Sequence, residues 1–330
     1  MPPTWPTLPA DHALLKLHAR LPDLVAAASG HRRIWGVELS LPPAVLPEDP
    51  SAVQQPDFAT LLVLQKFLRS QHGDVDKAVE ALGKTLKWRS EFGLDKQEGE
   101  EDKVEEDARD VKFDGLGWIT RVGFEGEGKR SVVCTWNIYG AAAKAGGLKV
   151  VFGDLEKPVL PPFPPFLPFL TPFCPCRFLR WRVDLMERSI AAILEPVLSG
   201  KEDAPPIPDY GEGEDPYQGY QVHDYMDISF LRMDPDVKAA SKATIEIMSA
   251  YYPEWLSRKF FVSVPLLMSW VFQAVRLLVS AETSRKFTVV SYKSNLVGEF
   301  DGGALGKARR EDLPQEYGGT SEKGLGELAV

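Results

Sequence analysis

Strand-like segments alternate with helical segments between residues 117 and 292, and this alternation constrains the fold more than any other feature of the sequence. The strand-like runs are short, apolar and bounded by turn residues, and they lie at residues 117–123, 131–138, 221–231, 259–264 and 286–292. Helical patterns cover residues 183–200 and 266–280, and a third begins at Pro235 with Asp234 as its cap. This order predicts an α/β fold with a mixed or mainly parallel sheet covered by helices.

The first hundred residues are predicted to be largely helical. An amphipathic stretch covers residues 12–28, and helical patterns follow at 58–71 and 74–92. Asp74 is a suitable N-cap for the last of these, because its carboxylate can accept hydrogen bonds from the free N–H groups of a first helical turn. An acidic run at residues 98–110 follows, and we interpret it as a solvated loop.

One segment, residues 158–177, does not fit the alternation. It carries eight prolines and shows neither a helical nor a strand period. Neither a helix nor a sheet tolerates that proline density, because proline lacks the N–H that both structures use. The segment is either a disordered insertion or an unspliced intron carried into the gene model, and we favour the intron.

Composition limits the classes of function. The net charge of −9 argues against nucleic-acid binding, which needs a basic face to neutralise phosphates. The three cysteines, Cys134, Cys174 and Cys176, are too few for a disulfide framework and fit a reducing compartment. The N-terminus lacks the pattern of a signal peptide. The most apolar run, residues 261–280, contains Arg276, which costs about 3 kcal/mol at the centre of a bilayer, so we expect a cytoplasmic protein without a membrane span.

No sequence motif predicts catalysis. Residues 123–130 nearly form a phosphate-binding loop, but Arg130 stands where Ser or Thr would bind the metal, and a strand follows where a helix is needed. Cys174 and Cys176 lie inside the proline-rich segment and lack further cysteines to complete a metal site. The chain has no nucleophile elbow and no paired histidine motif. We therefore expect a protein that is not an enzyme.

Four ordered motifs resemble a known family. They are KFLRSQHGDVDKAVEALGKTLKWR (66–89), YYPEWLSRKFFVSVP (251–265), LVSAETSRKFTVV (278–290) and LPQEYGG (313–319). Together they resemble the CRAL-TRIO family, which includes the yeast secretory phosphatidylinositol-transfer proteins. The resemblance covers residues 57–320 apart from the proline-rich segment. It implies an N-terminal helical tripod and a sheet-floored lipid pocket closed by a mobile helix.

The resemblance also implies a domain organisation and a location. An N-terminal extension (1–56) precedes the helical element (57–100) and the ligand-binding domain (101–320), and a short tail (321–330) follows. The expected partners are phosphatidylinositol and a membrane surface, with peripheral association with the endoplasmic reticulum and other membranes. The helix predicted at 266–280 would be the gate, although its wide apolar face is equally compatible with a buried core helix. The oligomeric state stays open.

Three further segments, TWNIYG (135–140), RWRVDLMERS (180–189) and QVHDYMDIS (221–229), resemble a haem-binding branch of the family, the fifth fungal homologue of the transfer protein. That resemblance implies that Tyr225 is the axial ligand of ferric haem b, that His223 supports it, and that Tyr139, Arg182 and Lys259 line the pocket. One departure stands out, because Gln71 and His72 occupy the place where the branch has an aromatic contact.

The chemistry of these residue types agrees with that implication. On a strand, His223 and Tyr225 are two residues apart and therefore point to the same face. A phenol has a pKa of about 10 in water, so binding as phenolate requires ferric iron and nearby hydrogen-bond donors. Tyrosinate is an established axial ligand of haem. In the alternative interpretation, this is a packed His–Tyr pair in a transfer protein without haem.

The resemblance assigns two other residues, Glu254 and Lys286, to the lipid headgroup. The lysine would pair with phosphate, and the carboxylate would accept hydrogen bonds from inositol hydroxyls. The alternative is an ordinary surface ion pair. Non-catalytic haem binding with phosphatidylinositol transfer is therefore the expected function. The rival is a pure phosphatidylinositol-transfer protein, and a haem-dependent peroxidase or oxygenase is disfavoured because no distal acid–base group is assigned.

Overall fold

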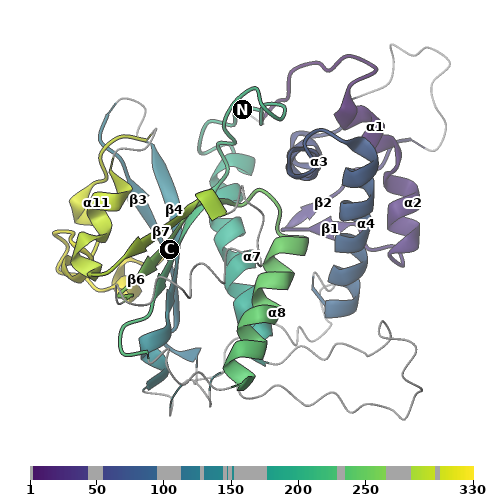
Figure 1. Cartoon of the computed structure of the whole chain (residues 1–330). Helices are drawn as coiled ribbons and strands as arrows, with labels where there is room; N and C mark the ends of the chain where they lie inside the picture. The colour runs from purple at the N-terminus through teal and green to yellow at the C-terminus, as the bar shows by residue number, and fades with distance from the viewer. Residues whose placement is uncertain are drawn as a thin grey trace, which may run out of the picture. The chain divides into compact units, whose positions relative to one another are not determined.

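The computed structural model describes residues 3–43, 55–94, 113–126, 130–143, 147, 151, 177–228, 235–264, 284–301 and 305–330 (Figure 1). The acidic run at 98–110, residues 158–176 of the proline-rich segment and the helix expected at 266–280 lie outside these ranges. The chain forms two compact units. The first contains residues 1–101, 190–219 and 247–257, and the second contains residues 102–189, 220–246 and 258–330.

The first unit is built mainly from short amphipathic helices. Its N-terminal elements are α1 (Ala13–Ala19), α2 (Leu21–Ala27), β1 (Arg33–Ile34), β2 (Val37–Glu38), α3 (Phe58–Ser70) and α4 (Val75–Phe92). The amphipathic stretch 12–28 thus forms two helices, not one. Pro22 explains the break, because it has no N–H to continue the hydrogen-bond ladder of α1 and is instead tolerated in the first turn of α2.

The predicted helices α3 and α4 are confirmed, and both have side-chain caps. The carboxylate of Asp57 accepts a hydrogen bond from the Thr60 N–H, and Asp74 accepts one from the Lys77 N–H. Helix α4 ends at Gly93, which adopts the left-handed conformation with φ of 81° that glycine allows without steric cost. The cap predicted at Asp74 is therefore confirmed, whereas α3 was located by its apolar pattern alone.

Aromatic rings dominate the core of the first unit. The Trp35 ring stacks on Phe67 with centroids 5.5 Å apart and meets Trp255 edge-on at 5.0 Å. The Trp88 ring stacks on Tyr251 at 4.3 Å. Such pairs add about 0.5–1.5 kcal/mol each beyond the burial of their surface. They join helices near the N-terminus to the segment 247–257 of the same unit.

The sheet has five strands in the order β3-β4-β5-β6-β7. These strands are β3 (Gly117–Gly123), β4 (Ser131–Ile138), β5 (Gly219–Asp224), β6 (Leu256–Val262) and β7 (Phe287–Val290). β3 and β4 form an antiparallel hairpin, whereas the β4–β5 and β6–β7 pairs are parallel. The predicted mixed, parallel-rich α/β fold is confirmed.

The two faces of the sheet in the second unit carry different side chains. One face is apolar, and its buried Val122, Trp136, Val222 and Phe260 form a core with the C-terminal elements. The elements that contribute to this core are α11 (Leu296–Phe300), η7 (Gln315–Tyr317) and α12 (Leu325–Leu328). The short turns η5 (Lys293–Asn295) and η6 (Arg310–Asp312) have no buried residues. The other face carries buried polar side chains that alternate with this apolar set.

Helix α7 (Arg177–Leu198) packs on the polar face through its first half, residues 177–189. A Cβ at Gly117 would lie 2.8 Å from side-chain atoms of Trp181 and Leu185, so only glycine permits this close approach of helix and strand. The Thr135 and Ser189 hydroxyls are 2.5 Å apart across the same contact. Helix α7 therefore fixes one wall beside the polar face.

Several predicted boundaries shift in the structure. The helix predicted at 183–200 is α7 (Arg177–Leu198), and the strands predicted at 221–231, 259–264 and 286–292 are β5, β6 and β7 with the bounds given above. Helix α7 begins at Arg177, so that residue belongs to the helix and not to the proline-rich segment. Strand β5 was predicted to reach residue 231, but it ends at Asp224. The Asp224 carboxylate accepts a hydrogen bond from the Met226 N–H at 2.9 Å, and Asp227 has a φ of 63°, so the chain turns here.

The remaining described elements are η3 (Tyr139–Ala143), which follows β4, and α8 (Pro235–Tyr251), which starts at the predicted proline. Among the described helices, none is long and apolar enough to cross a membrane.

Candidate functional site

Three of the residues predicted to line a pocket lie together on the polar face of the sheet. His223 is on β5, Tyr225 follows that strand directly, and Tyr139 opens η3 at the end of β4. The Tyr139 hydroxyl oxygen is 3.2 Å from Nδ1 of His223. The ring of Tyr225 is centred 5.1 Å from that of Tyr139 and 6.5 Å from that of His223. We call these three residues the tyrosine–histidine cluster.

Tyr225 lies beyond the end of β5, yet it keeps the orientation that the strand pattern predicted. Its backbone N–H donates to the Val262 carbonyl at 3.0 Å, which continues the pairing toward β6 by one residue. The rings of His223 and Tyr225 are tilted by only 24° and stack on one side of the sheet. The prediction that both side chains share a face is confirmed by this geometry.

Phenylalanine side chains extend the cluster along β6 and β7. The ring of Phe261 is 5.9 Å from His223 and 6.4 Å from Tyr225, and Phe287 meets it edge-on at 5.2 Å. Lys259 lies two residues before Phe261, and its Nζ is 5.6 Å from the Phe261 ring centre. Sequence reasoning missed both phenylalanines. The period of two along β6 would have placed Phe261 on the face of Lys259.

Arg182 of α7, also predicted for the pocket, is 1 % exposed and acts electrostatically on the cluster. Burial lowers the pKa of His223 well below its usual range, and the positive charges of Lys259 and Arg182 add to that shift. The imidazole is therefore neutral. Burial together with Arg182 also lowers the pKa of Lys259 to about 7.

The two tyrosines are neutral phenols in this structure. Burial raises the pKa of Tyr139 and raises that of Tyr225 well above 10, while Arg182 opposes both shifts. The nearest carboxylate along the chain, Asp224, lies on the opposite face and accepts a hydrogen bond from the Tyr317 hydroxyl at 2.8 Å. The cluster thus combines neutral rings with two buried basic groups, and this arrangement favours an anionic ligand.

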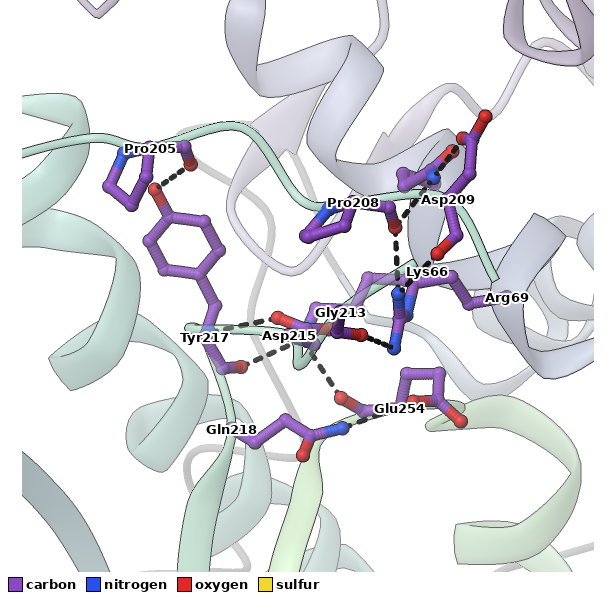
Figure 2. Close-up of polar contacts among 11 residues, drawn as sticks. Lys66, Arg69, Pro205, Pro208, Asp209, Gly213, Asp215, Tyr217, Gln218 and Glu254 are labelled. Atoms are coloured by element: carbon purple, nitrogen blue, oxygen red, sulfur yellow. Dashed lines mark hydrogen bonds and ion pairs between the residues drawn. The ribbon is translucent and has the colours of Figure 1, made fainter. Parts of the chain in front are cut away.

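The first unit contains a second polar cluster, centred on Lys66 of α3 (Figure 2). The Lys66 ammonium pairs with Asp215 at 2.8 Å, and neither side chain is exposed to solvent. It also donates to the backbone carbonyls of Tyr217 and Glu254 at 2.7 and 2.8 Å, and it lies 3.9 Å above the Trp255 ring. Three acceptors match the three N–H donors of an ammonium group.

Two further side chains of α3 hold the loop that precedes β5. Arg69 donates to the carbonyls of Pro208 and Gly213 at 2.7 and 3.0 Å. Gln65 donates to the Asp209 carboxylate at 2.7 Å. No sequence signal predicts these contacts, because the partners are about 140 residues apart along the chain.

The predicted headgroup residues occupy different units. Glu254, in the first unit, has a left-handed φ of 59°, and its carboxylate accepts a hydrogen bond from the Gln218 amide at 3.0 Å. Lys286, in the second unit, is partly buried, and its carbonyl accepts from the Lys259 N–H at 2.8 Å. Their joint role in binding a headgroup stays a prediction.

Gln71 and His72 were noted because they replace an expected aromatic contact. Gln71 is the partly buried C-cap of α3. His72 is exposed, has a left-handed φ of 56°, and its ring lies 4.5 Å from that of Tyr210. His72 is therefore a solvent-facing residue at the end of α3.

A helical unit together with a five-stranded, parallel-rich sheet carrying a buried cluster on one face defines the class of a CRAL-TRIO protein. The family model described as CRAL/TRIO domain matches residues 215–319. The phosphatidylinositol transfer protein SFH5 of Cryptococcus neoformans var. neoformans serotype D is 48% identical over 324 residues, which cover 98% of this chain and 91% of that protein. The protein of the same name from Phaeosphaeria nodorum is 42% identical over 322 residues, covering 97% and 80%.

A solved structure agrees with the sequence relatives. The crystal structure of Sfh5 superposes with a TM-score of 0.64 at 25% sequence identity, and the match covers 96% of this chain and 90% of that one. The chain therefore belongs to the Sfh5 group of the CRAL-TRIO family. The family predicted from the four sequence motifs is confirmed.

Proposed function

We propose that this chain is a non-catalytic phosphatidylinositol transfer protein whose pocket also binds haem b. The observation that supports transfer is 48% identity, over nearly the whole of both chains, to a protein named for that activity. The observation that supports haem is the tyrosine–histidine cluster beside Arg182 and Lys259. The two functions rest on different residues, so they can be tested separately.

The lipid headgroup is assigned to Lys286 and Glu254. The lysine ammonium pairs with the phosphodiester, and the Glu254 carboxylate accepts hydrogen bonds from inositol hydroxyls. The partner surface is a membrane, with which the protein associates peripherally from the cytoplasm, at the endoplasmic reticulum among other membranes. A transfer protein needs only transient contact with that surface.

The residues of the cluster fit haem. The Tyr225 oxygen would be the axial ligand, Tyr139 and His223 would support it, and Arg182 and Lys259 would face the propionates. When bound, haem supplies a ferric ion that accepts the phenolate. Within the described residues, no three His, Cys, Asp or Glu side chains form a metal site. Haem binding through a single tyrosinate would not require one, because the porphyrin itself holds the iron.

Transfer is tested with labelled phosphatidylinositol moving between donor and acceptor vesicles. Lys286→Ala and Glu254→Gln should each lower the transfer rate about tenfold, since a lost charge-assisted hydrogen bond costs about 1.5–3 kcal/mol. Glu254→Gln keeps an acceptor for the Gln218 amide and leaves the backbone carbonyl for Lys66. Haem content should not change in either variant.

The matched control for the lysine is Lys323→Ala, an exposed residue near the C-terminus. It should transfer lipid at the wild-type rate. If Lys286→Ala also transfers at that rate, the assignment of Lys286 to the headgroup is wrong. If either headgroup variant loses transfer and haem together, the residue supports the fold instead of the headgroup.

Haem binding is tested first on the wild-type chain, purified from cells supplied with haem. The proposal predicts a red-brown protein with a Soret band and close to one haem per chain. A colourless protein that still transfers phosphatidylinositol would support the rival function, a pure transfer protein in which Tyr225 only lines the pocket.

A further inference from the structure

Glu254 occupies a backbone position that usually takes glycine. It follows Pro253 in the turn between α8 and β6, and its φ of 59° is left-handed. Glycine is the ordinary residue at a turn position with positive φ, because a side chain there crowds the neighbouring carbonyl oxygen. A glutamate is therefore strained at this position, and the turn itself does not explain why the chain has one.

The buried ammonium of Lys66 fixes the backbone at Glu254. Its Nζ donates to the Glu254 carbonyl at 2.8 Å and to the Tyr217 carbonyl at 2.7 Å. These two carbonyls belong to the segments that lead into β6 and β5. Just beyond them, the Gly219 N–H donates to the Trp255 carbonyl at 3.0 Å. The two segments are therefore held at a fixed spacing where they enter the sheet.

Gln218 binds one oxygen of the Glu254 carboxylate across this spacing. Its amide nitrogen donates to Oε2 at 3.0 Å, and Figure 2 shows the bond. The direction of the bond is unambiguous, because an ionised carboxylate only accepts hydrogen bonds and an amide nitrogen only donates them. Both side chains are partly exposed, in contrast to the fully buried Lys66. Oε1 of Glu254 can therefore accept a hydroxyl group from a ligand while Oε2 stays bonded to Gln218.

We propose that Gln218 is a positioning residue for the phosphatidylinositol headgroup, which holds the Glu254 carboxylate so that its second oxygen accepts an inositol hydroxyl. A side chain that is already held in its binding orientation loses less conformational entropy when the ligand binds. Lys66 contributes by fixing the backbone from which this carboxylate extends. The proposal rests on the assignment of Glu254 to the headgroup under the proposed function.

The test measures the initial rate of phosphatidylinositol transfer by the full-length protein against the mole fraction of this lipid in the donor vesicles. Gln218→Met removes the amide and keeps an unbranched side chain. It should raise the mole fraction that gives the half-maximal rate about fivefold, as expected for one lost hydrogen bond, and leave the maximal rate unchanged. The control is Gln315→Met, an exposed glutamine, which should match the wild type. An unchanged half-maximal mole fraction in Gln218→Met would overturn the proposal.

A double-variant cycle separates positioning from a general structural role. Glu254→Ala removes the carboxylate that Gln218 holds, so adding Gln218→Met to it should change the half-maximal mole fraction by less than about twofold. If Gln218→Met has the same effect with and without the Glu254 carboxylate, the amide acts independently of Glu254, and the proposal is wrong.

The backbone geometry is tested without lipid, by urea unfolding of Glu254→Gly and Glu254→Ala. Both variants lose the bond to Gln218, so they differ mainly in backbone preference. Glycine is the more stable residue at a left-handed position and alanine at an ordinary one, so Glu254→Gly should have the higher urea midpoint. A higher midpoint for Glu254→Ala would overturn the geometry on which the proposal stands.

Failure of the proposed function gives a different result. A wild-type chain that transfers no phosphatidylinositol, while Glu254→Gly has the higher midpoint, would overturn the transfer function and the headgroup role with it, and only the turn geometry would stand. A wild-type chain that transfers the lipid while Gln218→Met matches it would overturn the role of Gln218 alone.

Discussion

His18 is a buried histidine whose surroundings make it neutral. It is 8 % exposed, and its Nε2 lies 2.8 Å from the Ser40 carbonyl oxygen. Burial lowers the pKa of His18, while the hydrogen bond with Ser40 and the charge of Asp57 oppose that shift. Asp57 and Ser40 both bond to Thr60 at the start of α3. His18 thus belongs to the contact that joins the N-terminal segment to this helix.

This environment predicts a pH dependence of stability. The folded-state pKa lies below the unfolded value of about 6.5, so the unfolded chain takes up the proton first as the pH falls. The contribution of His18 should be complete above pH 6.5 and decrease below it, by at most about 1.4 kcal/mol at pH 5.5. The buried, neutral His223 adds a decrease of the same sign, which a variant of His18 leaves in place. Urea unfolding at pH 7.5 and 5.5, followed by tryptophan fluorescence, measures the decrease.

The comparison with His18→Gln isolates the contribution of His18. Glutamine keeps a side-chain donor for the Ser40 carbonyl but does not titrate, so the decrease between the two pH values should be smaller in this variant. His72→Gln changes an exposed histidine of the same unit and serves as the control. An equal decrease in His18→Gln and wild type would show that His18 is not the group responsible.

At the scale of elements, the Lys66–Asp215 pair joins α3 to the loop before β5. Removing one partner of a buried ion pair leaves an unpaired charge, which typically costs about 3–5 kcal/mol. Lys66→Met should therefore lower the unfolding free energy of the protein by about that amount. The double variant Lys66→Met/Asp215→Asn should recover part of the loss, because the introduced amide is uncharged and its oxygen can still accept from the Tyr217 N–H.

The control for Lys66 is Lys84→Met, which breaks an exposed i,i+4 pair with Glu80 on α4. Exposed pairs contribute about 0–1 kcal/mol, so this variant should stay near wild type in the same urea experiment. If Lys66→Met is as stable as Lys84→Met, the buried pair does not hold the loop, and the interpretation of the cluster in Figure 2 is wrong.

Some elements could be predicted from the sequence, and others could not. Helices α3 and α4 were predictable because their signals are local, as in the caps at Asp57 and Asp74. The end of β5 was not, because the apolar pattern continues past Asp224 and the turn is made by that residue's own carboxylate.

Some residues of the candidate site could likewise be predicted from the sequence, and others could not. His223 and Tyr225 were predictable as neighbours on one face from their spacing, and the motif resemblance added Tyr139. The place of Asn137 opposite His223 was not, because it depends on the register between β4 and β5. The network around Lys66 joins this residue to positions 151 and 188 residues further along the chain, and a single sequence carries no pattern for such pairs.

At the scale of the whole molecule, the chain is acidic overall yet basic at its proposed cargo site. Its net charge is −9, whereas Arg182 and Lys259 bring basic groups to the tyrosine–histidine cluster. Anionic cargo is therefore favoured by local contacts and not by the long-range field of the protein. Haem with its propionates and an anionic phospholipid both meet that condition.

The most direct test of the proposed haem site is the haem content and ferric absorption spectrum of Tyr225→Phe beside the wild type. Phenylalanine keeps the ring that packs on Tyr139 and Phe261 but removes the proposed ligand oxygen, and Tyr210→Phe, an exposed tyrosine of the first unit, is the control. We predict that Tyr225→Phe folds normally and either binds several-fold less haem or shows the spectrum of a different axial ligand. Full haem occupancy with an unchanged ferric spectrum in Tyr225→Phe would contradict tyrosinate ligation.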